Sequence, residues 1–247
     1  MTARELYEFA LVEVNKLHAP SLLLEDYNYF INKAVQQYIN LIYNKFDINQ
    51  QANDDLRALT STEEYDEIDN NSILLPNDYV HLLNCIVTIQ KGNDRCSGRS
   101  YTSAAKRLTS DTYAGTLNNY YLKPSVKRPY YMLKAGYPVQ TLSLDNKKHA
   151  NSTDANTIIP ELKIECGEGV VTKISIDYVR APRYIELTYD QIYSETDNSQ
   201  VLEFPDYVCF EIINIFTKLL MENASDPRLQ TNLAVNQTIA GPSASTT

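Results

Sequence analysis

Apolar residues recur at helical spacing in three stretches of the chain and predict three amphipathic helices. The first runs from Thr2 to Lys16 with Thr2 as its N-cap, and the second from Leu24 to Phe46. The third begins near Pro205 and continues to Met221. The break at residues 18–21 predicts that the first two helices form an antiparallel hairpin, on which the apolar stripe of the third can pack.

The middle of the chain has strand periodicity instead. In 171–179, the residues Ile174, Ile176 and Tyr178 alternate with polar positions, which is typical of a strand with one buried face. The β-branched run 84–90 predicts a strand, further strand candidates are 128–134, 139–144 and 162–166, and Gly167-Glu168-Gly169 predicts a turn. We therefore predict an α+β fold: a helical bundle, made of the N-terminal hairpin and the long C-terminal helix, with an inserted antiparallel β domain and an extended C-terminal arm.

These patterns divide the chain into four parts. We expect a helical hairpin and acidic loop, a β-rich middle domain, a C-terminal bundle helix and a C-terminal arm; their ranges are 1–72, 73–203, 204–225 and 226–247. Within the first part, the polar and acidic residues 47–71 predict an exposed connection with a helical turn near 54–58.

Composition narrows the choice of function. A net charge of -9 argues against generic coating of nucleic acid, which requires an excess of Lys and Arg. The N-terminus is not apolar enough for a signal peptide and the chain has no membrane-spanning stretch, so we expect a cytoplasmic protein with no membrane partner and with reduced, mostly buried cysteines. Nineteen tyrosines favour wet protein interfaces, because tyrosine joins an apolar ring to a polar tip.

Motifs for catalysis and for cofactors are missing. The chain has no GxxxxGK[S/T], GxGxxG, HExxH or GxSxG motif, and its three histidines have no metal-ligand spacing. Carboxylates between Asp54 and Asp69 could perform acid–base chemistry, but a solvated acidic face is the favoured interpretation. We expect no enzyme, no cofactor and no metal. A pocket with two converging carboxylates would favour the enzyme alternative.

Charge is distributed unevenly along the chain. Residues 91–134 hold nine Lys and Arg but two Asp, and also six tyrosines. If copies join head to tail, this basic segment can meet the acidic segment of the next copy. The candidate inter-subunit residues are Arg99, Arg107, Lys127 and Arg128 on the basic side, and Asp54, Asp55, Glu63, Glu64, Asp66 and Glu67 on the acidic side. Screening within one chain and contact with nucleic acid are alternatives.

The C-terminal segment 229–247 contains no charged residue and too little apolar surface for a core of its own. A charge-free strip suits a groove on a partner, where burying unpaired charges would be costly. The candidate anchors are the spaced aliphatic residues Leu229, Leu233, Val235 and Ile239.

Short phrases along the chain resemble one family. Leu74-Leu75-Pro76-Asn77-Asp78-Tyr79 leads into a predicted strand, and Arg128-Pro129-Tyr130-Tyr131 follows a Tyr-rich loop. The phrases from Ile174 to Pro182 and from Leu202 to Tyr207 then precede the last helix. In this order, and preceded by the predicted N-terminal helical pair, they resemble the head-to-tail connector, or adaptor, proteins of short-tailed bacteriophages. The composition, rich in Asn, Tyr and Ile, is similar to that of crAss-like phages.

The resemblance implies a structural virion protein at the head–tail junction, assembled in the host cytoplasm. It implies a ring of twelve copies beneath the portal that extends the DNA channel and gives a platform for tail assembly. The partners would be the portal, through the C-terminal arm, and the next tail ring or nozzle protein, with DNA only as channel cargo. Another tail ring, such as a nozzle or hub component, is the nearest alternative, and a DNA-binding protein is a further one.

Overall fold

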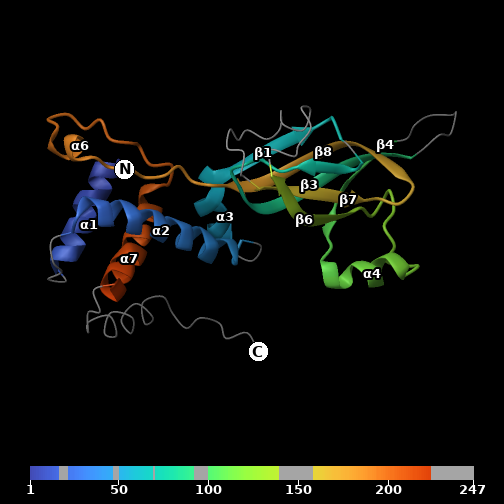
Figure 1. The fold of residues 1–247 in the computed structure, drawn as a ribbon, viewed down its shortest axis with the longest axis horizontal. Helices are drawn as coiled ribbons and strands as arrows, with labels where there is room; N and C mark the ends of the chain where they lie inside the picture. Colours follow the sequence, from blue (N-terminus) through green and yellow to red (C-terminus); the bar gives the residue numbers. More distant parts are fainter. Residues whose placement is uncertain (17–21, 47–49, 69, 92–99, 139–157, 224–247) are drawn as a thin grey trace. The chain divides into compact units, whose positions relative to one another are not determined.

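The computed structural model describes residues 1–16, 22–46, 50–68, 70–91, 100–138 and 158–223. They divide into two compact units (Figure 1): a helical unit, made of Met1–Ala58 with the described residues from Pro182 onward, and a β unit, Leu59–Ala181. The chain leaves the helical unit once, forms the whole β unit, and then returns.

Six α-helices lie in the described residues: α1 (Ala3–Lys16), α2 (Leu24–Tyr43), α3 (Gln50–Leu56), α4 (Ser110–Asn118), α6 (Tyr189–Tyr193) and α7 (Asp206–Asn223). The strands are β1 (Thr60–Tyr65), β2 (Ser72–Leu74), β3 (Tyr79–Lys91), β4 (Ser100–Ala104), β5 (Lys106–Arg107), β6 (Tyr130–Pro138), β7 (Ile158–Glu165) and β8 (Gly169–Arg180). The three long helices and the strands predicted at 84–90, 128–134, 162–166 and 171–179 are confirmed. The strand predicted at 139–144 lies outside the described residues.

The core of the helical unit forms around α7. The side chains of Val208, Ile212 and Phe216 are buried because they share the inner face of this helix. Tyr27 of α2 packs edge-on against Phe216, with ring centroids 5.6 Å apart, and against Tyr7 of α1 at 4.9 Å. Aromatic rings at the centre therefore join all three long helices.

The arrangement predicted for these helices was wrong. The fold is α+β with two four-stranded sheets, and the described helices do not form a bundle of an N-terminal hairpin plus a long C-terminal helix. In Figure 1, α2 runs across α1 and α7 instead of alongside them. Periodicity reveals that a helix has an apolar face, but it does not reveal which element covers that face or at what angle. The predicted C-terminal arm lies outside the described residues.

Two asparagines of α2 hold the returning chain in an extended conformation. The Asn32 amide donates to the Ile185 carbonyl (2.7 Å) and accepts from the Ile185 N–H (2.9 Å). Asn28, one helical turn earlier, makes the same pair of bonds with Leu187, at 2.9 and 3.1 Å. Each side-chain amide thus replaces a neighbouring strand, and the buried Ile185 and Leu187 side chains face the core.

The β unit is a sandwich of two sheets. Their strand orders are β1-β8-β3-β4 and β2-β7-β6-β5, and buried residues of both sheets form one core, including Cys85, Ile176, Leu162 and Ile164. All strand pairs are antiparallel among the described strands except β5 with β6, which is parallel and differs from the predicted antiparallel domain. The predicted turn at Gly167-Glu168-Gly169 is confirmed, and it carries the chain from one sheet to the other.

A bulge in β8 explains one break in its alternation. Thr88 pairs with Lys173 but the next residue, Ile89, pairs with Val171, so Thr172 is an extra residue on β8. In a regular strand, residues three positions apart point to opposite faces, yet Val171 and Ile174 are both buried. Thr172, between them, is exposed. The bulge therefore turns Val171 toward the core.

The acidic segment at 47–71 is not the exposed connection that was predicted. It contains α3, with buried Ala52, Asp55 and Leu56, and then β1, which pairs with β8 from Thr60 to Tyr65. The polar residues Thr62 and Glu64 lie on the exposed face of β1. Frequent charges concealed this strand because an outer strand of a sandwich needs few apolar residues.

Replacing Asn32 by Asp tests the amide pairs. Asn32→Asp keeps an acceptor for the Ile185 N–H but removes the donor to the Ile185 carbonyl, which would then face a carboxylate. We expect a loss of about 1–3 kcal/mol in the free energy of unfolding, measured by urea denaturation. Gln36→Glu makes the same chemical change at an exposed position of α2 and should cost much less. Equal losses in the two variants would contradict this role of Asn32.

Candidate interaction surfaces and polar clusters

A basic surface gathers where β5 meets β6. The Lys106 N–H donates to the Pro129 carbonyl (3.0 Å), and Lys106 and Arg107 pair with Tyr130 and Tyr131. Just before β6, a tight turn joins Ser125 to Arg128 through two backbone hydrogen bonds of 3.2 and 2.9 Å. This pairing brings four exposed cations to one end of one strand: Lys106, Arg107, Lys127 and Arg128.

Two exposed tyrosines accompany these cations. Tyr120 and Tyr121 are 88% and 82% exposed, and their rings meet edge-on with centroids 5.5 Å apart. The Arg128 guanidinium donates to the Tyr121 carbonyl at 2.6 Å, which fixes the tyrosine segment beside the turn. Large aromatic side chains beside arginine are typical anchors of protein interfaces, so we call these six residues (Lys106, Arg107, Tyr120, Tyr121, Lys127 and Arg128) the basic edge.

Carboxylates gather on β1 and on the residues that follow it. Glu64 pairs with Lys173 of β8 at 2.7 Å, and Glu63 accepts a 2.5 Å hydrogen bond from the Tyr65 hydroxyl. Asp66 and Glu67 are exposed beyond the end of the strand. Glu63, Glu64, Asp66 and Glu67 form what we call the acidic edge.

The acidic and basic edges lie on opposite sides of the sandwich. β1 and β4 are the outer strands of one sheet, and β2 and β5 are those of the other. Only Ala105 separates β4 from β5, so these two outer strands lie on the same side. β1 and β2 must then lie together on the other side, and Tyr65 and Ile73 indeed share the core there. In Figure 1, α4, which follows β5, lies below the β unit, whereas β1 runs along its upper side.

Other candidate residues from the sequence are placed differently. Asp54 is exposed on α3, in the helical unit, and Asp55 is 4% exposed, so its carboxylate serves the interior of that unit. Arg99 and the four candidate portal-docking residues Leu229, Leu233, Val235 and Ile239 lie outside the described residues.

Asp55 belongs to a cluster of carboxylates and tyrosines. Its carboxylate accepts hydrogen bonds from the Tyr38 hydroxyl (3.2 Å) and the Gln51 amide (2.9 Å). The charge of Asp55 also acts on Tyr207 and Glu211, both of α7. Burial, followed by the charges of Glu211 and Asp55, raises the pKa of the Tyr38 hydroxyl, which therefore stays a hydrogen-bond donor at neutral pH.

Glu211 is the member of this cluster that sequence reasoning missed. Although Glu211 is exposed on α7, partial desolvation first, and then the charge of Asp55, raise the pKa of its carboxyl above its ordinary value. Glu211 and Asp55 are far apart in the sequence, and no motif connects a glutamate on an apolar helix with the acidic segment.

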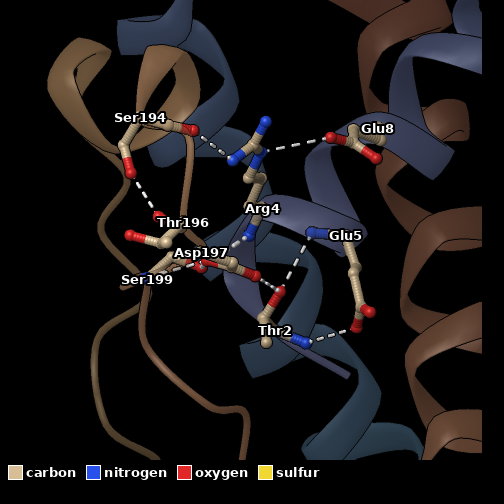
Figure 2. Close-up of polar contacts among 8 residues, drawn as sticks. All are labelled: Thr2, Arg4, Glu5, Glu8, Ser194, Thr196, Asp197 and Ser199. Atoms are coloured by element: carbon tan, nitrogen blue, oxygen red, sulfur yellow. Dashed lines mark hydrogen bonds and ion pairs between the residues drawn. The ribbon is translucent and has the colours of Figure 1, made fainter.

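The N-terminal end of α1 is fastened to residues 194–199 by a second polar cluster (Figure 2). Thr2 and Glu5 cap the helix reciprocally: the Thr2 N–H donates to the Glu5 carboxylate (2.8 Å), and the Glu5 N–H donates to the Thr2 hydroxyl (3.2 Å). The Thr2 hydroxyl then donates to Asp197 at 2.6 Å. Arg4 donates to the Ser194 carbonyl at 2.9 Å and pairs with Glu8 at 3.3 Å.

The carboxylate of Asp197 is used for structure in this cluster. Besides Thr2, it accepts from the Ser199 hydroxyl (2.6 Å) and the Ser199 N–H (2.9 Å). These bonds to Ser199 and Thr2 lower the pKa of Asp197 to about 2. A carboxylate with so low a pKa is a poor proton acceptor at neutral pH. The cluster is therefore better explained as a structural attachment of the N-terminal helix than as a reactive site.

Several observations bear on other classes of site. Cys85, Cys166 and Cys209 are free and buried, as predicted, while Cys96 lies outside the described residues. The part of the chain that the structure describes holds no group of three or more His, Cys, Asp or Glu side chains suited to a metal ion. None of its helices is long and apolar enough to cross a membrane.

Comparison with known proteins gives no match, either to a protein-family model or to a curated protein.

Glu211→Gln tests the raised pKa of the Glu211 carboxyl. Because the folded-state pKa of Glu211 is raised, ionisation of this group disfavours the folded state: the penalty is absent well below the unfolded pKa of about 4.3 and grows as the pH rises through the folded pKa. We expect Glu211→Gln to have a higher melting temperature than the wild type at pH 7 and to lose this advantage near pH 4. Glu222→Gln, three turns further along the same helix, is the control. A pH-independent difference would contradict the raised pKa of Glu211.

Asp197→Ala should have the opposite pH dependence. A lowered folded-state pKa stabilises the fold above the unfolded pKa of about 3.9, and this stabilisation is lost as the pH falls through about 2. The variant should therefore be less stable than the wild type at pH 6, and the difference should shrink between pH 4 and pH 2. Thermal unfolding followed by circular dichroism measures it, with Glu195→Ala as an exposed control nearby. A constant difference across this range would remove the proposed role of the carboxylate.

Proposed function

We propose that this protein is a structural component of a virion: a ring adaptor between the portal and the tail of a short-tailed bacteriophage. In this role it extends the DNA channel, gives a platform for tail assembly and resides at the head–tail junction after assembly in the host cytoplasm. The ring contains several copies, twelve by resemblance, and the neighbours are the portal on one side and the next tail ring or nozzle protein on the other.

The observation that carries the proposal is the position of the four family-like phrases. Residues 74–79 join β2 to β3, and 128–131 lead into β6. Residues 174–182 end β8, and 202–207 lead into α7. Each phrase thus lies where one element gives way to the next, and such junctions determine the path of the chain in a fold. The order of the four phrases along the chain supports the resemblance more strongly than any one phrase alone.

The distribution of charge and aromatic residues also supports an assembly role. The basic and acidic edges are exposed on opposite sides of the β unit, and Tyr120 and Tyr121 are almost fully exposed. Surfaces of this kind are typical of proteins that contact other proteins. The net charge of -9 suits a channel through which DNA passes without sticking, because like charges repel the phosphates.

The basic edge favours a second candidate function, binding of DNA. Arginine, lysine and exposed tyrosines can contact phosphates and stack on bases. The two functions differ in one measurable property: DNA binding by the isolated protein would fall steeply with salt concentration, because each neutralised phosphate releases counterions.

Removing the charge-free segment 229–247 tests the adaptor function. The shortened protein should keep the melting temperature of the full chain, because a charge-free segment with so few apolar residues has little to contribute to a core. We expect it to lose attachment to the portal protein encoded in the same genome, measured by co-sedimentation with assembled portal rings. Normal attachment by the shortened protein would contradict docking through the arm.

A matched pair of full-length variants distinguishes the effect of the four aliphatic anchors from the effect of shortening the chain. One replaces Leu229, Leu233, Val235 and Ile239 by Ser, and the other replaces the polar residues Gln230, Asn232, Asn236 and Gln237 by Ser. The first should behave like the shortened protein, and the second like the wild type, if burial of the four aliphatic side chains drives docking.

A further inference from the structure

The two charged edges of the β unit cannot neutralise each other within one copy. Four strands at a spacing of about 4.8 Å place the two outer strands of a sheet about 14 Å apart. Charges exposed to water interact weakly beyond the Debye length, which is about 8 Å at physiological ionic strength. The acidic edge follows β1 and the basic edge surrounds β5, on opposite sides of the sandwich. Screening of one edge by the other is therefore too weak to account for the charge asymmetry.

Internal contacts leave much of each edge available. On the acidic edge, Glu64 is paired with Lys173, but Asp66 and Glu67 are exposed beyond the strand. On the basic edge, Arg128 is used in holding the Tyr121 carbonyl, whereas Arg107 and Lys127 are exposed on β5 and at the tip of the turn. Two described carboxylates lie close to this edge: Asp111, four residues after Arg107, and Glu165, which pairs across from Tyr130 but is already bound by Lys163. They do not cancel the four cations.

Symmetry then decides how two copies can use these edges. In a two-fold dimer the same patch meets itself, which would place cations against cations or carboxylates against carboxylates. Edges on opposite sides of one unit cannot both belong to a single two-fold interface. A head-to-tail contact instead brings the basic edge of one copy to the acidic edge of the next, and repetition of that contact gives a ring when the rotation closes.

We propose that the β unit joins copies of this chain head to tail, with Arg107 and Lys127 of one copy facing Asp66 and Glu67 of the next. The exposed Tyr120 and Tyr121 supply the apolar area of the contact, and the charges fix its direction. This inference rests on the proposed function in one respect, because an adaptor ring requires such a repeating contact. The contact itself is a property of the isolated chain and can be measured without a portal.

Charge reversal on each edge gives a direct test. The first variant carries Arg107→Glu and Lys127→Glu, and the second carries Asp66→Lys and Glu67→Lys. Self-association of the wild type, measured by sedimentation velocity over a range of concentrations at low salt, should weaken as salt is added. Each variant alone should associate more weakly by on the order of tenfold or more, because every contact then opposes like charges.

Mixing the two variants distinguishes head-to-tail association from other arrangements. In an equimolar mixture, each contact again joins opposite charges, so association should return to about the wild-type level. A single chain with all four substitutions should also associate, because its two edges have exchanged sign. Melting temperatures verify that each variant folds, and matched controls are Lys33→Glu with Lys45→Glu, and Glu186→Lys with Glu195→Lys, all at exposed positions of the helical unit.

Three results would overturn the inference: a wild type that stays monomeric at low salt, variants that associate like the wild type, or a mixture as weak as its components. Salt-sensitive binding to duplex DNA that is lost in the first variant, with self-association unchanged, would assign the basic edge to DNA instead. If the self-association test fails but removal of 229–247 still abolishes portal attachment, the adaptor function stands without this contact. If the copies associate as expected but the shortened protein still attaches to the portal, the head-to-tail contact stands and the adaptor function is rejected.

Discussion

The helical unit depends on bringing together two stretches of chain that are separated by the whole β unit. Asn28 and Asn32 of α2 meet this requirement, because each side-chain amide satisfies both backbone groups of a residue in the returning segment. A buried extended segment without such partners would carry unsatisfied N–H and C=O groups. With Ile185 and Leu187 held in place, the chain continues to α7, whose apolar face then completes the core against α1 and α2.

The β unit obeys a different constraint, the order of strands in its two stacked sheets. Because a single residue joins β4 to β5 and a short turn joins β7 to β8, the sheets must stack with matching edges. This stacking buries one face of each sheet in a common core and leaves the acidic and basic residues at opposite edges. The β unit therefore has two different surfaces on opposite sides. Two different surfaces allow a repeating head-to-tail assembly, whereas a two-fold dimer uses one surface twice.

Polar residues that look alike in the sequence have different roles in the fold. Asp55 is buried beside Tyr38, while its neighbour Asp54 is exposed. The hydrogen bonds of Asp197 lower the pKa of its carboxyl, whereas partial desolvation and the charge of Asp55 raise the pKa of Glu211. Local environment, and not residue type, therefore separates carboxylates that fasten elements together from those that remain available at a surface.

Residue patterns alone determined the three long helices and the four longest strands, β3, β6, β7 and β8, since periodicity depends only on which side chains must be buried. They also determined that charge is unevenly divided along the chain. The sequence did not reveal the crossing of α2 over α7, the strand β1 within an acidic segment, or the hydrogen bond between Tyr38 and the buried Asp55. These features depend on which elements meet, and contacts between residues distant in the chain are decided only when the whole core packs. The same holds for the two charged edges: the sequence contains the charges, and the stacking of the sheets decides that they face opposite ways.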